Sequence, residues 1–492
     1  MFSEVAVESI RLSHVVNKMS APNKSSTSKL RRDLGSIESY AALIGILIGA
    51  GIFQVTSQAW ALTGPSVILG YLILIPAILS TSIPYAAYLS TPLGTEPGGE
   101  YLHISRTLRG YRLAYVGSWL KIISYVGAGA YLANALAGYL IAFARGRIGS
   151  SWQLPIAIAG LILFYGIHVV GIRWFGRIQV VLSTLKCLAL FVLIVPGLFV
   201  IHRENYTPFV THGVSGFAVS LLPLFFAYAG FESLAQTAGE VKDSTKRLPR
   251  ILLKGIAITG IIYVFTSFVS FGVLPGTRLQ GSSAPMAEVA SVYLPAGAAM
   301  FVTLGAILAI MTALNGTMMV PSRMLMMFAD DRLAPRWLGH INPRTGTPIR
   351  GLTLTLVVCA ALLCSGQLSL ALNVAVFALV VLYFLHSLVF FLLSRLNAGL
   401  ESQIKLGMPK RLMQISALVS VVSMGALIVI QLLRDVDALR TSTLAQRVSG
   451  HSLTSIELLT IWGVVGFCLY VLARVRSGAS IDLPSPVSIP GD

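Results

Sequence analysis

The chain has 492 residues, of which 55% are hydrophobic and 11% are charged, whereas an ordinary soluble domain has about 25% charged residues. Its net charge of +17 does not indicate nucleic-acid binding, because the basic residues lie in short segments between apolar runs rather than on one stripe. Apolar runs of about 20 residues, long enough to cross a bilayer, recur along most of the chain. Composition and length therefore favour one membrane domain over several soluble ones.

The predicted elements begin with a polar, basic segment, residues 1–35, which we expect to be a disordered cytoplasmic tail. Twelve candidate spans follow, and they begin near Ser36, Gly64, Arg112, Trp152, Arg177, Val214, Arg250, Pro295, Thr347, Ser369, Pro409 and Thr454. The last of them ends near residue 476, and residues 477–492 form a second short tail. The sequence thus predicts an all-α integral membrane protein with about twelve transmembrane helices.

Lys and Arg residues indicate the orientation, because loops rich in them stay in the cytoplasm. With the N-terminus inside, about 27 basic residues fall in cytoplasmic segments and about 7 fall outside. We therefore expect a multi-pass protein of the plasma membrane with both termini in the cytoplasm.

Two predicted spans carry residues that interrupt a helix near its middle. The first contains Gly49-Ala50-Gly51, and glycine costs about 1 kcal/mol per helical position relative to alanine. The sixth contains Phe226-Ala-Tyr-Ala-Gly230 followed by Glu232. The two interrupted spans are the first and the sixth, which predicts two halves of five helices each with opposite orientation. These halves are residues 36–201 and 214–396, and residues 409–476 lie outside this repeat.

Interrupted spans of this kind expose backbone groups at the membrane midplane. Freed amides at the start of a half-helix can bind a carboxylate, and freed carbonyls can accept from an ammonium group. Both charges of an α-amino acid can be bound in this way without a charged side chain. The predicted substrate-binding residues are Leu47, Gly49, Ala50, Gly51, Phe226, Ala227, Ala229 and Gly230. The alternative is that the glycines only permit close helix packing, since Gly45 and Gly49 have that spacing.

The residues Gly49-Ala-Gly-Ile-Phe53, the segment from Phe225 to Glu240 and Pro97-Gly-Gly-Glu-Tyr101 resemble the amino acid, polyamine and organocation transporter superfamily. The resemblance covers roughly residues 36–400 and implies a leucine-transporter-like fold with alternating access. It also implies that Phe226 is a gate that caps the substrate on its outer side. Ala50 departs from the pattern, because many relatives have serine there.

Two ionisable side chains lie deep within the predicted spans, Lys186 in the fifth and Glu232 in the sixth, and each costs at least about 2.5 kcal/mol there. The resemblance implies that both take part in proton coupling, because similar proton-coupled carriers have a lysine in span five. The alternatives are a Lys186 that snorkels or is paired permanently with carbonyls, and a Glu232 bonded to the backbone of span one. Glu240 is expected to form an ion pair with Lys242 or Lys246.

Several other residues carry weaker signals. Tyr125, Tyr131 and Asn315 are candidates for lining the pocket, although packing is the more common role. His168, His340 and His386 are isolated in the sequence, and the four cysteines fall in apolar segments without metal-ligand spacing. We therefore predict no cofactor and no metal site.

The sequence thus predicts a secondary transporter of neutral or apolar amino acids, driven by proton symport. It is not expected to be an enzyme, since no catalytic constellation or nucleotide-binding loop is visible. The alternatives are an amino-acid exchanger, a sodium-coupled or polyamine transporter, and a membrane sensor without transport. The lack of another acid near the site argues against cationic substrates.

Overall fold

The computed structural model describes residues 30–49, 51–144, 147–279, 282, 285–366, 368–443, 447 and 453–477. Within these ranges the chain forms helices and loops, and the one β-type pairing is an isolated bridge between Leu34 and Val241. The predicted all-α membrane fold is therefore confirmed. The two terminal tails predicted from the sequence lie almost entirely outside the described residues.

Eleven helical segments of the described chain are long and apolar enough to cross a membrane: Ser36–Phe53, Thr56–Leu89, Arg112–Phe143, Ser150–Val170, Ile172–Gly197, Gly213–Glu240, Ser244–Val273, Ala296–Asp330, Leu372–Phe391, Lys410–Thr441 and Ser455–Val475. A shorter apolar helix, Ile349–Cys364, brings the number to the twelve predicted. Helices suit a bilayer, because each one satisfies its backbone hydrogen bonds within its own segment.

The helices of the bundle are α2 (Ser36–Leu47), α3 (Thr56–Thr63), α4 (Val67–Leu89), α5 (Glu100–Leu108), α6 (Arg112–Phe143), α7 (Gln153–Val170), α8 (Ile172–Gly197), α9 (Gly213–Tyr228), α10 (Ser244–Val273), α11 (Gly276–Leu279), α12 (Pro285–Tyr293), α13 (Ala296–Asp330), α14 (Ile349–Cys364), α15 (Leu368–Phe391), α16 (Leu393–Leu396), α17 (Ala398–Ser402), α18 (Lys410–Thr441) and α20 (Ser455–Ser477). Short 3₁₀ turns lie at Gly64–Ser66, Pro92–Thr95, Ser150–Trp152, Arg203–Tyr206 and Arg336–Gly339. Pro295, Pro348 and Pro409 occupy the N-cap positions of α13, α14 and α18, where the sequence predicted that spans begin.

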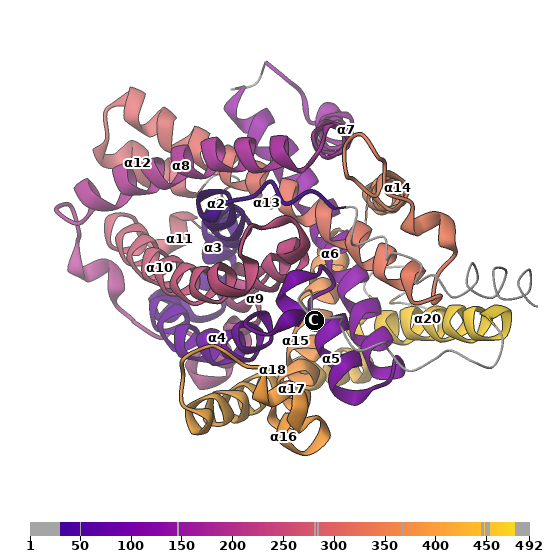
Figure 1. The fold of residues 1–492 in the computed structure, drawn as a ribbon. Coiled ribbons are helices and arrows are strands. Elements are labelled where there is room, and N and C mark those ends of the chain that lie inside the picture. The colour runs from indigo at the N-terminus through magenta and orange to yellow at the C-terminus, as the bar shows by residue number, and fades with distance from the viewer. Residues whose placement is uncertain are drawn as a thin grey trace, which may run out of the picture.

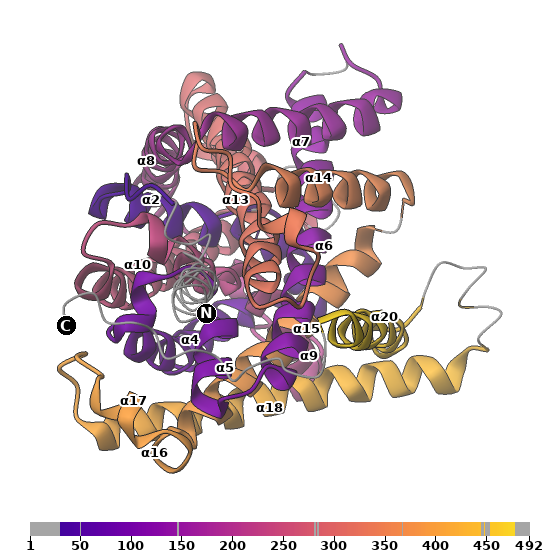
Figure 2. The same cartoon turned by 45° about the vertical axis from the view of Figure 1, so that its right-hand side comes forward.

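The interrupted spans lie near the centre of the bundle. Figure 1 shows α2, α3 and α9 surrounded by α4, α6, α8, α10, α13 and α15, whereas α18 and α20 lie toward the edge in both views (Figures 1 and 2). Helix α20 packs on α6 and α15, and little of its surface is buried. This arrangement places residues from both breaks against the helices that surround them.

Both predicted breaks are present. Helix α2 ends at Leu47, and the chain continues as a five-residue π-helical turn, η2 (Gly51–Val55), before α3 begins. Helix α9 ends at Tyr228, Ala229 is extended, Gly230 has φ of 106°, and a ten-residue 3₁₀ helix follows as η7 (Phe231–Glu240). Single π turns occur often at functional sites, and 3₁₀ helices seldom exceed four residues. Both interruptions are therefore departures from a plain transmembrane helix.

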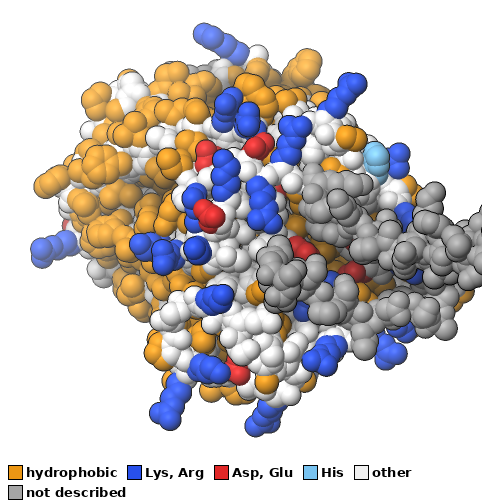
Figure 3. Space-filling view, in the orientation of Figure 1, with side chains coloured by type: hydrophobic (Ala, Val, Ile, Leu, Met, Phe, Trp, Pro, Cys, Tyr) orange, Lys and Arg blue, Asp and Glu red, His pale blue; other side chains and the backbone are white. Residues whose placement is uncertain are grey.

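The molecular surface is divided by residue type. Figure 3 shows a face on which Lys and Arg side chains are scattered over polar surface, while hydrophobic side chains cover the edge on the left. Large exposed hydrophobic residues such as Leu72, Phe191 and Val422 lie on membrane-spanning helices. An apolar edge and a charged face are what a protein embedded in lipid requires.

Candidate functional site

A cavity lies where the two breaks meet, and about 440 Å³ of space in it, counted together with its open side, is not filled by atoms. Its walls come from α2, η2, α6, α9, α13, α15 and the residues that follow α9. Six of the predicted substrate-binding residues line it: Leu47, Gly49, Gly51, Phe226, Ala229 and Gly230. The other lining residues are apolar, except for the hydroxyl-bearing Ser124, Tyr125 and Thr317. The cavity therefore offers backbone groups and hydroxyls to a solute within a mainly apolar surface.

The remaining two predicted substrate-binding residues do not line the cavity in the described structure. Ala50 lies outside the described residues. Ala227 instead forms the contact between the two breaks, because a Cβ atom added to Gly51 would lie only 2.5 Å from the Ala227 Cα atom. Glycine at 51 is therefore required for the two segments to approach this closely.

A tyrosine of α10 joins the two breaks. The Tyr263 hydroxyl contacts the Leu47 carbonyl oxygen at the end of α2 and lies 2.7 Å from the Ala227 carbonyl oxygen in α9. Tyr263 is fully buried, and its ring packs near those of Tyr71 and Tyr228. Tyr263 was not among the predicted site residues, because a tyrosine within an apolar helix gives no functional signal. Its position makes Leu47 and Ala227 structural as well as cavity-forming residues.

Some of the backbone groups expected to be free already have partners. The Gly49 amide donates to the Leu47 carbonyl oxygen at 2.9 Å, and the Ala229 amide donates to the Phe226 carbonyl oxygen at 3.1 Å. The Gly230 amide donates to Glu232 Oε2 at 3.1 Å. A carbonyl oxygen has two lone pairs, so Phe226 can accept a second donor, whereas the Leu47 carbonyl already has the Gly49 amide and the Tyr263 hydroxyl as partners. An amide has only one hydrogen. A bound carboxylate would have to compete for these amides.

Lys186 is fully buried and its ammonium group is surrounded by oxygen atoms. The Nζ atom donates to the carbonyl oxygens of Ile44, Gly45 and Ile48 at 3.1, 2.9 and 2.7 Å and to Thr312 Oγ1 at 2.8 Å. The three carbonyls belong to the last turn of α2, where a helix has unpaired acceptors and a negative dipole end. Within the described chain no carboxylate forms an ion pair with Lys186. The lysine therefore supplies a donor to carbonyl oxygens at the end of α2, including those of Gly45 and Ile48 beside the break.

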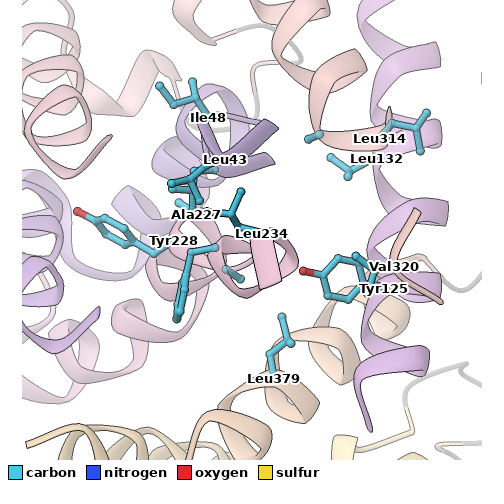
Figure 4. Close-up of a cluster of buried hydrophobic side chains, with 14 of the residues drawn as sticks. Leu43, Ile48, Tyr125, Leu132, Ala227, Tyr228, Leu234, Leu314, Val320 and Leu379 are labelled. Carbon is cyan, nitrogen blue, oxygen red and sulfur yellow. The ribbon is translucent and has the colours of Figure 1, made fainter. Parts of the chain in front are cut away.

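Glu232 is fully buried beside the cavity. The Tyr125 hydroxyl donates to its Oε1 atom at 2.6 Å, the Tyr383 hydroxyl contacts Oε2, and the Gly230 amide also donates to Oε2. Figure 4 shows Tyr125 reaching from α6 toward the segment that carries Ala227 and Leu234. The carboxylate thus binds the break of its own span and two neighbouring helices, and no described hydrogen bond joins it to span one.

A second buried carboxylate lies near Glu232. Glu100, at the start of α5, forms an ion pair with Lys121 of α6, with Nζ 2.8 and 2.9 Å from its two oxygens. The Tyr85 hydroxyl and the Gln236 side chain also donate to Glu100, at 2.8 and 3.4 Å. The Pro-Gly-Gly-Glu segment was a sequence signal for this region, but nothing in the sequence paired Glu100 with Lys121.

The expected ion pair of Glu240 is different in the structure. Its Oε1 atom lies 2.9 Å from an Arg323 guanidinium nitrogen of α13, and both side chains are 1% exposed. The prediction of a pair with Lys242 or Lys246 was therefore wrong, because the end of η7 turns Glu240 into the protein rather than toward its own loop. The buried pair joins η7 to α13 on the side of Glu232 away from the cavity.

A second hollow lies on the other side of Phe226. About 640 Å³ of space in it, counted together with its open side, is not filled by atoms, and its lining comes from η2, α3, α9, the start of α15 and α18. Its polar lining residues are Gln58, Asn373, Gln431 and Arg434. Phe226 lines both hollows, and its ring lies 6.0 Å, edge to face, from that of Tyr131. One aromatic side chain therefore stands between the cavity and this vestibule.

The weaker candidates have mixed outcomes. Tyr125 lines the cavity, whereas Tyr131 and Asn315 do not. Asn315 donates to Gln179 at 2.8 Å and accepts at its carbonyl from His168, so it joins α7, α8 and α13. His386 is not isolated in space, since its Nε2 atom lies 2.9 Å from His103 Nδ1. No group of three or more potential metal ligands occurs among the described residues.

Comparison with known proteins adds the family. A profile for the family described as "Amino acid permease" matches residues 34–444. The methylthioribose transporter of Bacillus subtilis is 26% identical over 361 residues, which cover 70% of this chain and 77% of the relative. The branched-chain amino acid permease BcaP of the same organism is 25% identical, covering 66% and 72%. Cationic amino acid transporter 3 of Arabidopsis thaliana, named as mitochondrial, is 27% identical, covering 65% of this chain and 55% of the relative.

Proposed function

Because the chain belongs to the amino acid permease family, we propose that it carries neutral, apolar amino acids across the plasma membrane by alternating access, coupled to protons. The observation that carries this proposal is the cavity between the two breaks, with backbone groups of both interrupted spans in its walls. In this proposal both termini lie in the cytoplasm, and residues 36–400 form the transport core.

The lining of the cavity supports a neutral substrate. Leu132, Ala313 and Leu379 give it an apolar surface, and Ser124, Tyr125 and Thr317 contribute hydroxyls. The nearest carboxylate, Glu232, already accepts three hydrogen bonds. A substrate with a second cationic group would therefore lack a free partner and would bury an unpaired charge.

The two sides of the cavity support alternating access. On one side lies the vestibule, and Phe226 is the residue that lines both hollows. On the other side lie the Glu232 cluster with Tyr125 and Tyr383 and then the Glu240–Arg323 pair. A state with several buried polar contacts on one side and the Phe226 ring on the other fits one step of a transport cycle, in which Phe226 acts as the outer gate.

The surroundings of Lys186 support proton coupling. Loss of its proton would leave two N–H hydrogens for the three carbonyl oxygens that the ammonium group holds at the end of α2. A buried lysine changes its protonation state readily, so it can respond to the side of the membrane that it faces. Glu232 is the second coupling candidate, since its carboxylate binds the Gly230 amide at the other break.

Uptake into proteoliposomes tests the proposal. Labelled leucine, alanine, arginine and methylthioribose would be compared, each with a proton gradient, a sodium gradient and no gradient. We expect the neutral amino acids to accumulate with the proton gradient and to compete with one another. Uptake of methylthioribose or arginine alone would refute the substrate class, and accumulation that follows sodium would refute the coupling ion. Exchange without net accumulation would support the exchanger instead.

A further inference from the structure

A buried pair of histidines lies outside the transport site described above. His103 belongs to α5, His386 belongs to α15, and the His103 Nδ1 and His386 Nε2 atoms are 2.9 Å apart. Both side chains are 1% exposed or less. The Tyr88 ring stacks on His103 at 4.5 Å and the Tyr85 ring stacks on His386 at 3.8 Å. The two rings are therefore held in place on every side, without access to water.

The hydrogen bond limits how many protons the pair can carry. One ring nitrogen must donate and the other must accept, so the bond cannot form when both rings are fully protonated. His386 Nδ1 is buried and has no hydrogen-bond partner among the described residues. A buried N–H without an acceptor is costlier than a buried acceptor without a donor. The favoured arrangement therefore has His386 Nε2–H donating to His103 Nδ1, with both rings neutral.

The neighbouring charged and titratable groups do not stabilise a positive charge on the histidine pair. Some of them repel such a charge, and the others already have partners. Lys121 of α6 acts on both histidines, and its partner Glu100 of α5 is already engaged. The hydroxyls of Tyr85 and Tyr88 on α4 and of Tyr383 on α15 also face the pair. Glu232 of η7 is the remaining facing group, and its carboxylate is bound by Tyr125 and Tyr383. Helix α18 presents Ser420, which is uncharged and bonds Ser387. Burial and the nearby Lys121 lower the pKa of His103 to about 3.

Helix α5 is a short element of nine residues with positive φ values at both of its ends. It follows Gly98 and Gly99, with φ of 121° and 44°, and it ends at Arg109, with φ of 48°. The histidine bond links it to α15, which also carries Tyr383 one turn before His386. A change at the histidine pair is therefore one turn away from the cluster that closes the cavity.

We propose that His103 and His386 form a pH-sensitive latch that holds α5 against α15 while this side of the cavity is closed, and that acid favours the separated state. Once the helices separate, water can reach both rings and each can accept a proton. The latch would regulate the opening of the cavity on the side where Glu232, Tyr125 and Tyr383 lie. It does not depend on which solute is transported.

The direction of the pH effect distinguishes a contribution of the histidine pair from a contribution of the acidic residues around α5. The histidine pair takes up protons more readily when α5 has moved away, so acid favours separation. Asp331, which accepts hydrogen bonds from Tyr101 and Tyr111, has its pKa raised by burial, so acid would favour the packed state there. With an ordinary histidine pKa of about 6.5, lowering the pH from 7.5 to 5.5 increases the separated fraction about tenfold for each ring that titrates.

The test measures the exposure of α5 directly. Ser105 is buried on α5, and a Ser105→Cys variant of the full chain in detergent would be labelled with a maleimide at pH 5.5, 6.5 and 7.5. Cys364 is exposed, and its labelling, separated by mass spectrometry, corrects for the pH dependence of thiol reactivity. We expect the corrected labelling of residue 105 to rise about tenfold or more toward pH 5.5.

A second variant retains the hydrogen bond but removes the titration. In His103→Asn/His386→Gln, the two amide groups occupy the positions of the bonded ring nitrogens and can still pair. We expect this variant to show corrected labelling that does not change with pH, whereas His340→Gln, at an exposed position, should behave as the parent. The single variant His103→Asn should show an intermediate response. An unchanged or opposite pH response in the parent, or the same rise in the double variant, would overturn the latch.

Discussion

Replacing Lys186 with methionine separates its structural role from its role in coupling. The Ile44 carbonyl would still accept from the Ile48 amide and the Gly45 carbonyl would still accept from Thr312. Among the three carbonyls that Lys186 binds, the Ile48 carbonyl would be left with no other described donor, at a cost of about 1–3 kcal/mol. Removing a charge from the membrane interior returns about 2.5–3.5 kcal/mol. The two changes nearly cancel, so Lys186→Met should remain folded.

Coupling should be lost in the same variant. One proton carried per substrate down a gradient of two pH units supplies about 2.7 kcal/mol, which sustains about a hundredfold accumulation. Without a titratable group at position 186, we expect the accumulation ratio to fall to about one, while exchange of substrate across the membrane continues.

The assay compares gradient-driven accumulation with exchange in the same proteoliposome preparation. Lys254→Met is the matched control, because Lys254 is an exposed lysine of α10. Thermal unfolding in detergent reports whether each variant is folded. Accumulation by the Lys186→Met protein that still follows the proton gradient would show that the coupling site lies elsewhere, with Glu232 the next candidate.

Three further substitutions test the closed site. Gly51→Ala places a Cβ atom 2.5 Å from the backbone of Ala227 and should abolish uptake by separating the two breaks, as measured with labelled substrate. Glu240→Gln leaves the Arg323 charge buried and should lower the free energy of unfolding by about 3–5 kcal/mol in a denaturation assay. Phe226→Ala joins the cavity to the vestibule and should shorten the lifetime of bound substrate several-fold in a dissociation assay.

Controls for these substitutions come from similar residues in other environments. Gly425→Ala should have little effect, since its added Cβ would meet only the side chain of Phe384 at 3.6 Å. Asp243→Asn breaks an exposed pair with Arg247, which should cost less than about 1 kcal/mol. Equal effects of Asp243→Asn and Glu240→Gln would contradict the importance given to burial. Retained uptake in Gly51→Ala would show that the breaks need not touch.

The parts of the site that depend on backbone conformation could be predicted from the sequence. Glycine has distinctive φ values and no Cβ atom, so Gly49, Gly51 and Gly230 predicted interruptions that the structure contains. Hydropathy likewise predicted the spans, because a bilayer requires long apolar helices. Lys186 and Glu232 were visible because a charge inside an apolar span is rare.

The rest depended on pairing between distant parts of the chain, which periodicity does not reveal. Tyr263 and Tyr383 look like ordinary aromatic residues of buried helices, yet their hydroxyls bind the two breaks. Glu240 was assigned to the nearest lysines in sequence, whereas its partner is Arg323, 83 residues away. His386 gave no signal for the same reason, since His103 lies 283 residues away.

Tyr263 has a mechanical consequence. Since the one hydroxyl hydrogen of Tyr263 is shared between the carbonyl oxygens of Leu47 and Ala227, the two interrupted spans and α10 meet at a single group beside the cavity. A displacement of one break changes the share of this hydrogen that the other break receives. A solute that contacts only one of the two interrupted spans would therefore affect the position of both, so the two halves of the site are expected to move together.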